Sequence, residues 1–260
     1  MGPATLDNGL VKTPSLNLVV DAFQHEIDAI IATWRVQAGH KGVLGAATIY
    51  SASAAALTNC ATQWEYFRSE WHKKAIARDA TQYRAELVRR VKTFAAESAG
   101  GNDLVAALRD AGLEIEINLP KNPTIGTVSR LRDTREQNVS FRTQKESDTA
   151  ATRDLVPTYA ALPKSLSRDD WLVLEILIAV RNALAHASPR SIDAMNTALS
   201  SAAKVRGASN IRSLARLANR VTSSGIGKYL AASVSWDAGE EARVIAICRY
   251  VRVLGDKFRV

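Results

Sequence analysis

The sequence is poor in the residues that mark secreted, metal-binding and membrane proteins. Its only two cysteines, Cys60 and Cys248, are too few for a disulfide framework and lack any metal-ligand spacing. Its longest apolar stretch, residues 171–180, is interrupted by Glu175 and is too short to span a bilayer. The N-terminus has no basic patch followed by an apolar run, so we expect no secretory signal. We therefore expect a soluble, cytoplasmic protein with reduced cysteines, no metal, no cofactor and no membrane contact.

Aromatic residues, proline and glycine are also sparse. Among 260 residues, 6% are aromatic, 7 are proline and 14 are glycine, whereas 47% are hydrophobic. Leucine, alanine, arginine and glutamate dominate many windows, which favours helix over sheet. The length is sufficient for one large domain or for a core domain with an extension. The composition predicts an all-α fold of closely packed helices with a mostly aliphatic core.

Apolar residues recur at helical spacing through the first hundred positions. Residues 1–16 lack this periodicity and predict a flexible arm. A helix is predicted from Asn17 to the turn at residues 39–42, followed by a long helical region over 45–98 with a bend near 78–79. We expect the histidines of these helices, His25 and His72, to lie at the boundary between core and surface.

The middle of the chain is less regular. A short helix is predicted over 102–111, and residues 113–117 alternate like a single strand. The whole stretch 113–166 is polar and reads as an irregular insertion with one helix around 127–136. Long irregular segments in compact domains are often functional, so this insertion is a candidate for carrying specificity.

The strongest helix signal begins at a capping box. Ser167 and Asp170 have the spacing of reciprocal helix caps, and the window 171–180 that comes after them is apolar on every face. Such a helix belongs in the middle of a bundle. Pro189 ends it, and further helices are predicted over 191–205, 209–222 and 238–257.

The excess of positive charge is confined to one part of the chain. Residues 1–189 carry 22 basic and 21 acidic side chains, whereas residues 190–260 carry 12 and 5. A series spaced by four contains Lys204, Arg212, Arg216 and Arg220, with Ala208 between the first two. These residues would form one cationic stripe, interrupted by Gly207, if a single helix persisted there. A polyanion such as RNA would bind such a stripe through its phosphates, although a solvated helix face has the same pattern.

One short segment combines three groups that suit phosphate chemistry. Arg181, Asn182 and His186 lie at the end of the apolar window. Helical spacing places Asn182 and His186 on one face, whereas Arg181 is about 140° from His186. A histidine can transfer the proton when a ribose 2′-hydroxyl attacks the adjacent phosphate, and an arginine can offset the charge that develops. Asn182 could orient either the imidazole or the phosphate.

The arginine-to-histidine spacing alone is weak evidence, because it occurs twice. Arg35 and His40 have the same separation as Arg181 and His186. The first pair lacks a polar residue after the arginine and falls in a glycine-flanked turn. Only the second pair comes after a buried helix, so its context favours it.

With Asn182 after the arginine, the segment resembles the Arg-x(4–6)-His signature of HEPN domains. The segment 60–68 also resembles the second-helix region of stand-alone HEPN nucleases such as the RiboL-PSP group. The resemblance covers residues 17–206, which leaves a basic helical extension at 207–260 packed on the same domain. It implies an antiparallel helical bundle and a homodimeric, metal-independent endoribonuclease, of the kind found in toxin–antitoxin and antiviral systems.

The resemblance also implies how one histidine per chain can suffice. Two copies of Arg181 and His186 brought together by a two-fold axis would supply both an acid and a base. Members regulated by a nucleotidyltransferase antitoxin have a tyrosine two residues after the histidine, where this chain has Ser188. Regulation by modification of that tyrosine is therefore not expected, whereas another antitoxin or regulatory partner stays open.

Non-catalytic interpretations stay open at this point. Arg181 and His186 could simply interact with the dipole at a helix C-terminus, as in a helical adaptor. Some HEPN relatives bind RNA or protein without cleaving it. Glu65 and Glu175 could support the site, but a structural hydrogen-bonding role is the simpler interpretation of both.

Overall fold

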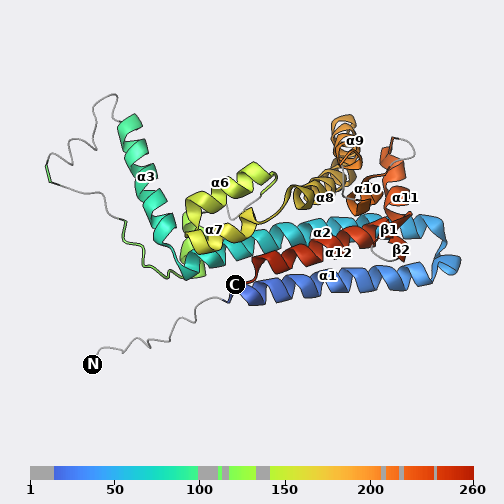
Figure 1. The fold of residues 1–260 in the computed structure, drawn as a ribbon, viewed down its shortest axis with the longest axis horizontal. Coiled ribbons are helices and arrows are strands. Elements are labelled where there is room, and N and C mark those ends of the chain that lie inside the picture. The colour runs from blue at the N-terminus through green and yellow to red at the C-terminus, as the bar shows by residue number, and fades with distance from the viewer. Residues whose placement is uncertain are drawn as a thin grey trace, which may run out of the picture.

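The computed structural model describes residues 15–98, 111–112, 117–132, 141–205, 209–216, 220–236 and 239–260. Within these ranges the chain is almost entirely helical, so the prediction of an all-α fold is confirmed (Figure 1). No helix in the described ranges is both long and apolar enough to cross a membrane. Residues 1–14 of the predicted arm, residues 102–110 of the predicted short helix and most of the strand-like segment at 113–117 lie outside the described residues. The predicted arm was two residues too long, because Ser15 caps α1 and Leu16 begins it.

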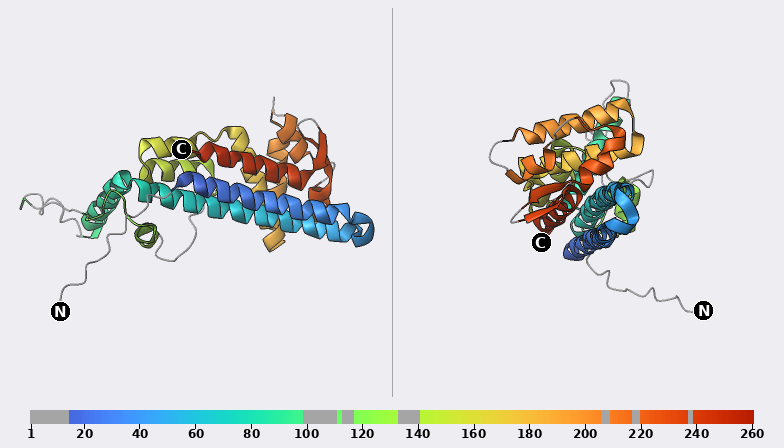
Figure 2. Two further views of the ribbon diagram at one scale, coloured as in Figure 1. Left: turned by 90° about the horizontal axis from the view of Figure 1, so that it is seen from below. Right: turned by 90° about the vertical axis from the view of Figure 1, so that its right-hand side faces the viewer.

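Two long antiparallel helices form one side of the molecule. They are α1 (Leu16–Gly39) and α2 (Lys41–Arg78), which run side by side in both views of Figure 2. The predicted turn between them is present, and α2 is kinked at Gly45, whose φ is 77° and ψ is 163°. This backbone conformation is open to glycine and strongly disfavoured for other residues. Gly45 therefore permits the tight reversal between α1 and α2.

The C-terminal helix packs along this pair and completes its core. α12 (Arg243–Leu254) runs beside both α1 and α2, and the 3-10 turn η2 (Gly255–Phe258) comes directly after it. Phe258 is fully buried, with its ring 5.3 Å from that of Phe67 and 5.2 Å from that of Trp71. The Trp71 indole also donates to the Phe258 carbonyl at 3.0 Å. The aromatic residues of α2 are thus core residues shared with the C-terminal segment.

The predicted bend after α2 is confirmed. Asp79 leaves the helix with an extended backbone, and its carboxylate accepts from the Thr81 amide at 3.0 Å, where α3 (Thr81–Ser98) begins. Burial opposes the charge on Asp79, but hydrogen bonds from Thr81 and the nearby Lys121 outweigh it and lower the pKa of this carboxyl. α3 then points away from the body of the molecule (Figure 1).

The middle of the chain is more helical than the sequence pattern predicts. The helix expected around 127–136 is present as α5 (Ile125–Arg132), and two further helices come after it, α6 (Gln144–Asp154) and α7 (Pro157–Lys164). α6 is polar, and buried polar contacts with α2 hold it in place. The His72 Nε2 atom lies 3.2 Å from Asp154 Oδ2, and both side chains are buried. The prediction that His72 lies at a core boundary is wrong, because this interaction takes it into the interior.

The central helix α8 (Arg168–His186) forms as the sequence predicts. Ser167 accepts from the Asp170 amide at 3.2 Å and Asp170 accepts from the Ser167 amide at 2.6 Å, which completes the capping box. Burial raises the cost of charge on Asp170, but hydrogen bonds from Lys257, Ser167 and Tyr250 outweigh it and lower the pKa of the carboxyl. Most of the apolar window after this cap is buried, but Ile178 and Ala179 are only partly buried, on the same side as Glu175. α8 packs against α2, α9 and α12.

The region after α8 contains shorter elements than predicted. α9 (Pro189–Ala203) and α10 (Ser209–Ala215) are followed by the 3-10 turn η1 (Ser223–Gly225) and by α11 (Ile226–Ala231). A two-stranded antiparallel hairpin, β1 (Ser233–Trp236) and β2 (Gly239–Ala242), then precedes α12. The predicted helices 209–222 and 238–257 are therefore too long. The first ends at Ala215, and the second begins only at Arg243, after the hairpin.

Candidate active site

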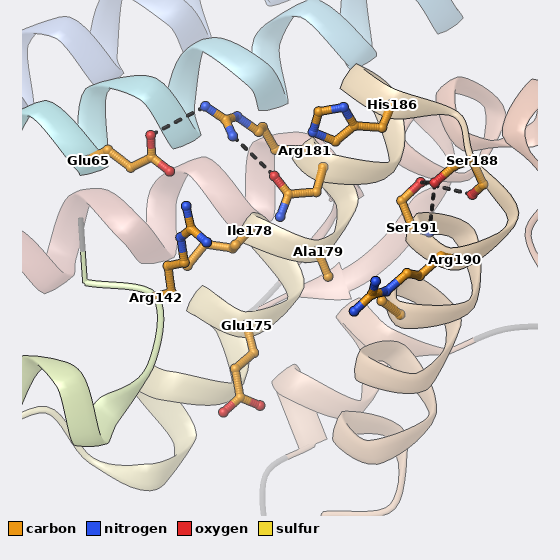
Figure 3. Close-up of a pocket in the computed structure, with 12 residues that line it drawn as sticks. Glu65, Arg142, Glu175, Ile178, Ala179, Arg181, His186, Ser188, Arg190 and Ser191 are labelled. Atoms are coloured by element: carbon orange, nitrogen blue, oxygen red, sulfur yellow. Dashed lines mark hydrogen bonds and ion pairs between the residues drawn. The ribbon is translucent and has the colours of Figure 1, made fainter. Parts of the chain in front are cut away.

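The residues of the central motif line one open cleft beside α8 (Figure 3). The cleft has a volume of about 680 Å³ and is bounded by α2, the segment before α6, α8 and the start of α9. Five residues selected from the sequence share it, namely Glu65, Glu175, Arg181, Asn182 and His186. The first half of α8 is largely buried in the bundle and fixes the axis from which four of these side chains project, all but that of Glu65.

Arg181 is held from two directions. Its Nη1 atom donates to Asn182 Oδ1 at 3.1 Å, and its Nη2 atom donates to Glu65 Oε2 at 3.4 Å across the cleft (Figure 3). Both partners of the ion pair keep about a third of their side-chain surface exposed, at 32% each. Such a pair contributes less than about 1 kcal/mol to stability. Its main effect is therefore to orient the guanidinium towards the cleft.

His186 is the last residue of α8 and is exposed to solvent. Ala187 comes next, in the left-handed region with φ 47°, and its amide donates to the Ala183 carbonyl at 3.0 Å. Ser188 then caps α9 by accepting from the Ser191 amide at 3.2 Å. The chain thus reverses directly after His186, which leaves the imidazole at the mouth of the cleft.

No bend of α8 brings Arg181 and His186 together. The helix is continuous from Arg168 to His186, so the two side chains leave its axis about 140° apart. Both nevertheless line the same cleft, because arginine is long and the cleft extends around this end of α8. Asn182 lies one turn before His186 on the same face of α8 and accepts a hydrogen bond from Arg181. The cleft can therefore present a cation, an amide and an imidazole to one bound molecule.

The two carboxylates of the cleft have different surroundings. Glu65 pairs with Arg181, whereas Glu175 pairs with Arg168 at 3.0 Å, two turns earlier on α8. Figure 3 shows Glu175 well apart from His186. Glu65 is thus placed to support the motif directly, whereas Glu175 lies at the edge of the cleft.

The sequence did not point to two further charged residues of the cleft, Arg142 and Arg190. Arg190 comes after Pro189, close to the motif, and the predicted helix boundary there was the one signal that could have placed it near His186. Arg142 lies in the segment treated as an irregular insertion. Nothing in its sequence surroundings indicates that it faces α8.

The basic residues after α9 do not form the continuous stripe that one persistent helix would give. α9 ends before Lys204, and α10 ends before Arg216. Arg220 forms an ion pair with Asp193 of α9. Lys204, Arg212, Arg216 and Arg220 are all exposed, so their contact with RNA stays a prediction, but without the stripe geometry.

The second match to the motif spacing has no comparable surroundings. Arg35 is an exposed residue of α1, and His40 is the exposed residue between α1 and α2. Neither comes after a buried helical segment like that of α8.

Comparison of the chain with protein-family models, with curated proteins and with solved structures finds no match. The function of the chain must therefore be inferred from the chemistry of the cleft.

Proposed function

We propose that the protein is a metal-independent endoribonuclease of HEPN type that acts as a homodimer, as a toxin or antiviral effector. The observation that carries the proposal is the shared cleft of Arg181, Asn182 and His186 at the end of a buried helix. An arginine oriented by a carboxylate and an exposed imidazole are the groups that cleavage of RNA without a metal requires. A role for the protein in RNA cleavage also agrees with its net charge of +8.

In the proposed reaction a ribose 2′-oxygen attacks the neighbouring phosphorus, and the bond from phosphorus to the 5′-oxygen breaks. One imidazole takes the 2′-hydroxyl proton, and a protonated imidazole gives a proton to the leaving 5′-oxygen. The products carry 2′,3′-cyclic phosphate and 5′-hydroxyl ends. Arg181 offsets the charge on the non-bridging oxygens, and Asn182 holds either Arg181 or the phosphate.

One His186 cannot supply both an acid and a base in a single step. Among the described residues, no hydrogen bond orients the His186 imidazole, and its exposure leaves it open to a second molecule. A two-fold axis beside this end of α8 would bring a second His186 to the same phosphate. The unit of function in this proposal is therefore a dimer with one composite cleft.

The first test is cleavage of total RNA by the purified protein in excess EDTA, beside Arg181→Ala and His186→Ala. We expect cleavage by the wild type and a loss of at least about a hundredfold in both variants. Arg35→Ala and His40→Ala are matched controls, because this pair has the same spacing without the cleft. Mass spectrometry of the products should show cyclic phosphate ends.

The second test is mixing of wild-type and His186→Ala chains under conditions that allow exchange. A composite site needs two intact histidines, so an equal mixture should keep about a quarter of the activity of the same amount of wild type, whereas independent sites would keep about half.

The alternative function is a non-catalytic HEPN module that binds RNA or a protein partner. It is favoured by the lack of an orienting group on His186 in the described part of the chain. Tight RNA binding without cleavage would select that alternative.

A further inference from the structure

Two arginines outside the motif face the cleft from opposite sides. Arg142 precedes α6, and Arg190 is the second residue of α9. Figure 3 shows Arg142 on one side of the α8 residues Ile178 and Ala179 and Arg190 on the other, with the motif residues between them and above. Both arginines are exposed and therefore accessible to a large ligand.

The charges of these two arginines are not neutralised within the described residues. Arg181 and Arg168 have carboxylate partners, Glu65 and Glu175, but neither Arg142 nor Arg190 forms an ion pair in the described part of the chain. An arginine that already has a carboxylate gives up that contact to bind an anion, whereas a free guanidinium does not. Arg142 and Arg190 are therefore the cations of the cleft most available to a phosphate.

The backbone at Arg142 is fixed by buried neighbours. Phe141 is buried against Arg68 of α2, whose guanidinium carbon lies 4.9 Å from the ring centroid. Arg68 also donates to Ser147 Oγ at 2.8 Å, and the Arg142 amide donates to Glu146 Oε2 at 2.9 Å. Burial lowers the pKa of Arg68 to about 9, which leaves it charged at neutral pH.

The backbone at Arg190 is fixed in a different way. Ser188 caps α9, and Pro189 occupies its first position, where the ring of proline presets the helical φ. Arg142 and Arg190 thus project from anchored segments next to two different helices. The two arginines therefore add affinity for a ligand that is long enough to reach both of them. They add none for a ligand that contacts only the motif.

We infer that Arg142 and Arg190 bind the phosphates on either side of the cleaved one, so that the cleft takes a segment of single-stranded RNA running across α8. The assignment of the cleaved phosphate rests on the proposed function, whereas the two flanking contacts do not. A single strand fits this arrangement because its backbone can bend into the cleft and can align the 2′-oxygen for attack. An A-form duplex holds its backbone rigid and away from that alignment.

The test uses His186→Ala protein, so that RNA stays intact, and a fluorescently labelled single-stranded oligoribonucleotide. Anisotropy titrations over a range of salt concentrations compare this protein with versions that also carry Arg142→Gln, Arg190→Gln or both. Each substitution should weaken binding about tenfold and reduce the salt slope of log K by about 0.7, the value for one phosphate contact on a single strand. Arg35→Gln, which changes an exposed arginine of α1 outside the cleft, is the matched control and should change neither quantity.

A second measurement separates this inference from the proposed function. In protein with an intact His186, the ratio of kcat/KM for a longer oligonucleotide to that for a dinucleotide should fall in the double variant, because a dinucleotide has no flanking phosphates for the two arginines to bind. If Arg142→Gln and Arg190→Gln change neither the affinity for the oligoribonucleotide nor the salt slope of log K, the inference is overturned, even if the protein cleaves RNA. Absence of cleavage, together with the expected loss of binding, would overturn the proposed activity and leave the two phosphate contacts supported.

Discussion

Arg181 of α8 and Glu65 of α2 are 116 positions apart in the sequence and face each other across 3.4 Å. Their ion pair connects the helix that carries the motif to the long helix of the bundle. Because both side chains are one-third exposed, solvent screens the attraction between them. The pair therefore has a larger influence on the direction of the guanidinium than on the stability of the fold.

This relationship predicts separate effects on activity and stability. Under the proposed function, Glu65→Ala should lower kcat/KM for RNA about tenfold, because Arg181 loses the group that orients it. The free energy of unfolding should fall by less than about 1 kcal/mol. Glu65→Gln keeps an acceptor for Arg181 and should restore part of the loss. Glu70→Ala removes a carboxylate that pairs with Lys73 on the same helix, outside the cleft, and serves as the control. Equal activity of Glu65→Ala and wild type would contradict a positioning role.

A second prediction concerns acid stability and the start of α8. Asp170 has a lowered pKa, so its contribution to stability is present above the unfolded-state pKa of about 3.9 and is lost as the pH falls through the folded-state value. At neutral pH, Asp170→Asn should reduce the free energy of unfolding by about 1–3 kcal/mol. The difference from wild type should shrink below about pH 4.

Urea denaturation across this pH range measures the effect. Asp169→Asn makes the same charge change one position earlier, at a residue outside the hydrogen bonds that Tyr250 and Lys257 give to Asp170. We expect its stability to stay close to that of wild type. If Asp170→Asn lowers the free energy of unfolding equally at low and neutral pH, the protonation of Asp170 does not control this part of the stability, and the prediction is wrong.

A third prediction rests on the left-handed backbone of Ala187. This conformation costs an alanine about 1–2 kcal/mol, whereas glycine adopts it without a steric penalty. Ala187→Gly should therefore raise the free energy of unfolding by about 0.5–1 kcal/mol, after the added entropy of the unfolded chain is subtracted. Ala185→Gly lies within α8 and should instead lower it by about 1 kcal/mol. Chemical denaturation of the two variants should give shifts of opposite sign.

A fourth prediction concerns the contact between α11 and α2. A Cβ atom at Gly227 would lie 2.6 Å from the Tyr50 carbonyl oxygen and 2.9 Å from its carbon, so the two backbones would have to separate. Gly227→Ala should cost about 1–3 kcal/mol of stability. Gly126→Ala, in α5, meets nothing closer than 3.9 Å and should be neutral or stabilising by up to about 1 kcal/mol. Thermal denaturation measures the effect. A melting temperature for Gly227→Ala equal to or higher than that for Gly126→Ala would refute the close approach of α11 to α2 at this point.

The sequence predicted those elements whose signals are local. The capping box at Ser167 and Asp170 and the apolar window after it located α8, and hence the motif at its end. The turn after Gly39 and the bend near Asp79 were also predicted, because a helix boundary is set by a few neighbouring residues.

Elements held by distant partners were not predicted. α6 has little apolar periodicity, and contacts such as that between His72 and Asp154 hold it against α2. In the β-hairpin, Val234 and Trp236 are buried while the serines beside them are exposed, an alternation visible in the sequence but too short to outweigh the helical pattern around it. Arg142 reaches the cleft only through the packing of α6, which no local pattern encodes.

The place of Phe258 in the core has a consequence for how the chain folds as it is synthesised. Trp64, Phe67 and Trp71 of α2 surround this ring, which is fully buried. α1 and α2 are synthesised well before Phe258, which comes 187 positions after Trp71, so their aromatic face lacks this partner until Phe258 has emerged. Glu65 lies on the same helix, so one wall of the cleft reaches its final packing only at that stage of translation. Under the proposed function, a nascent chain should therefore stay inactive until Phe258 is available, which would limit damage to the RNA of the translating ribosome.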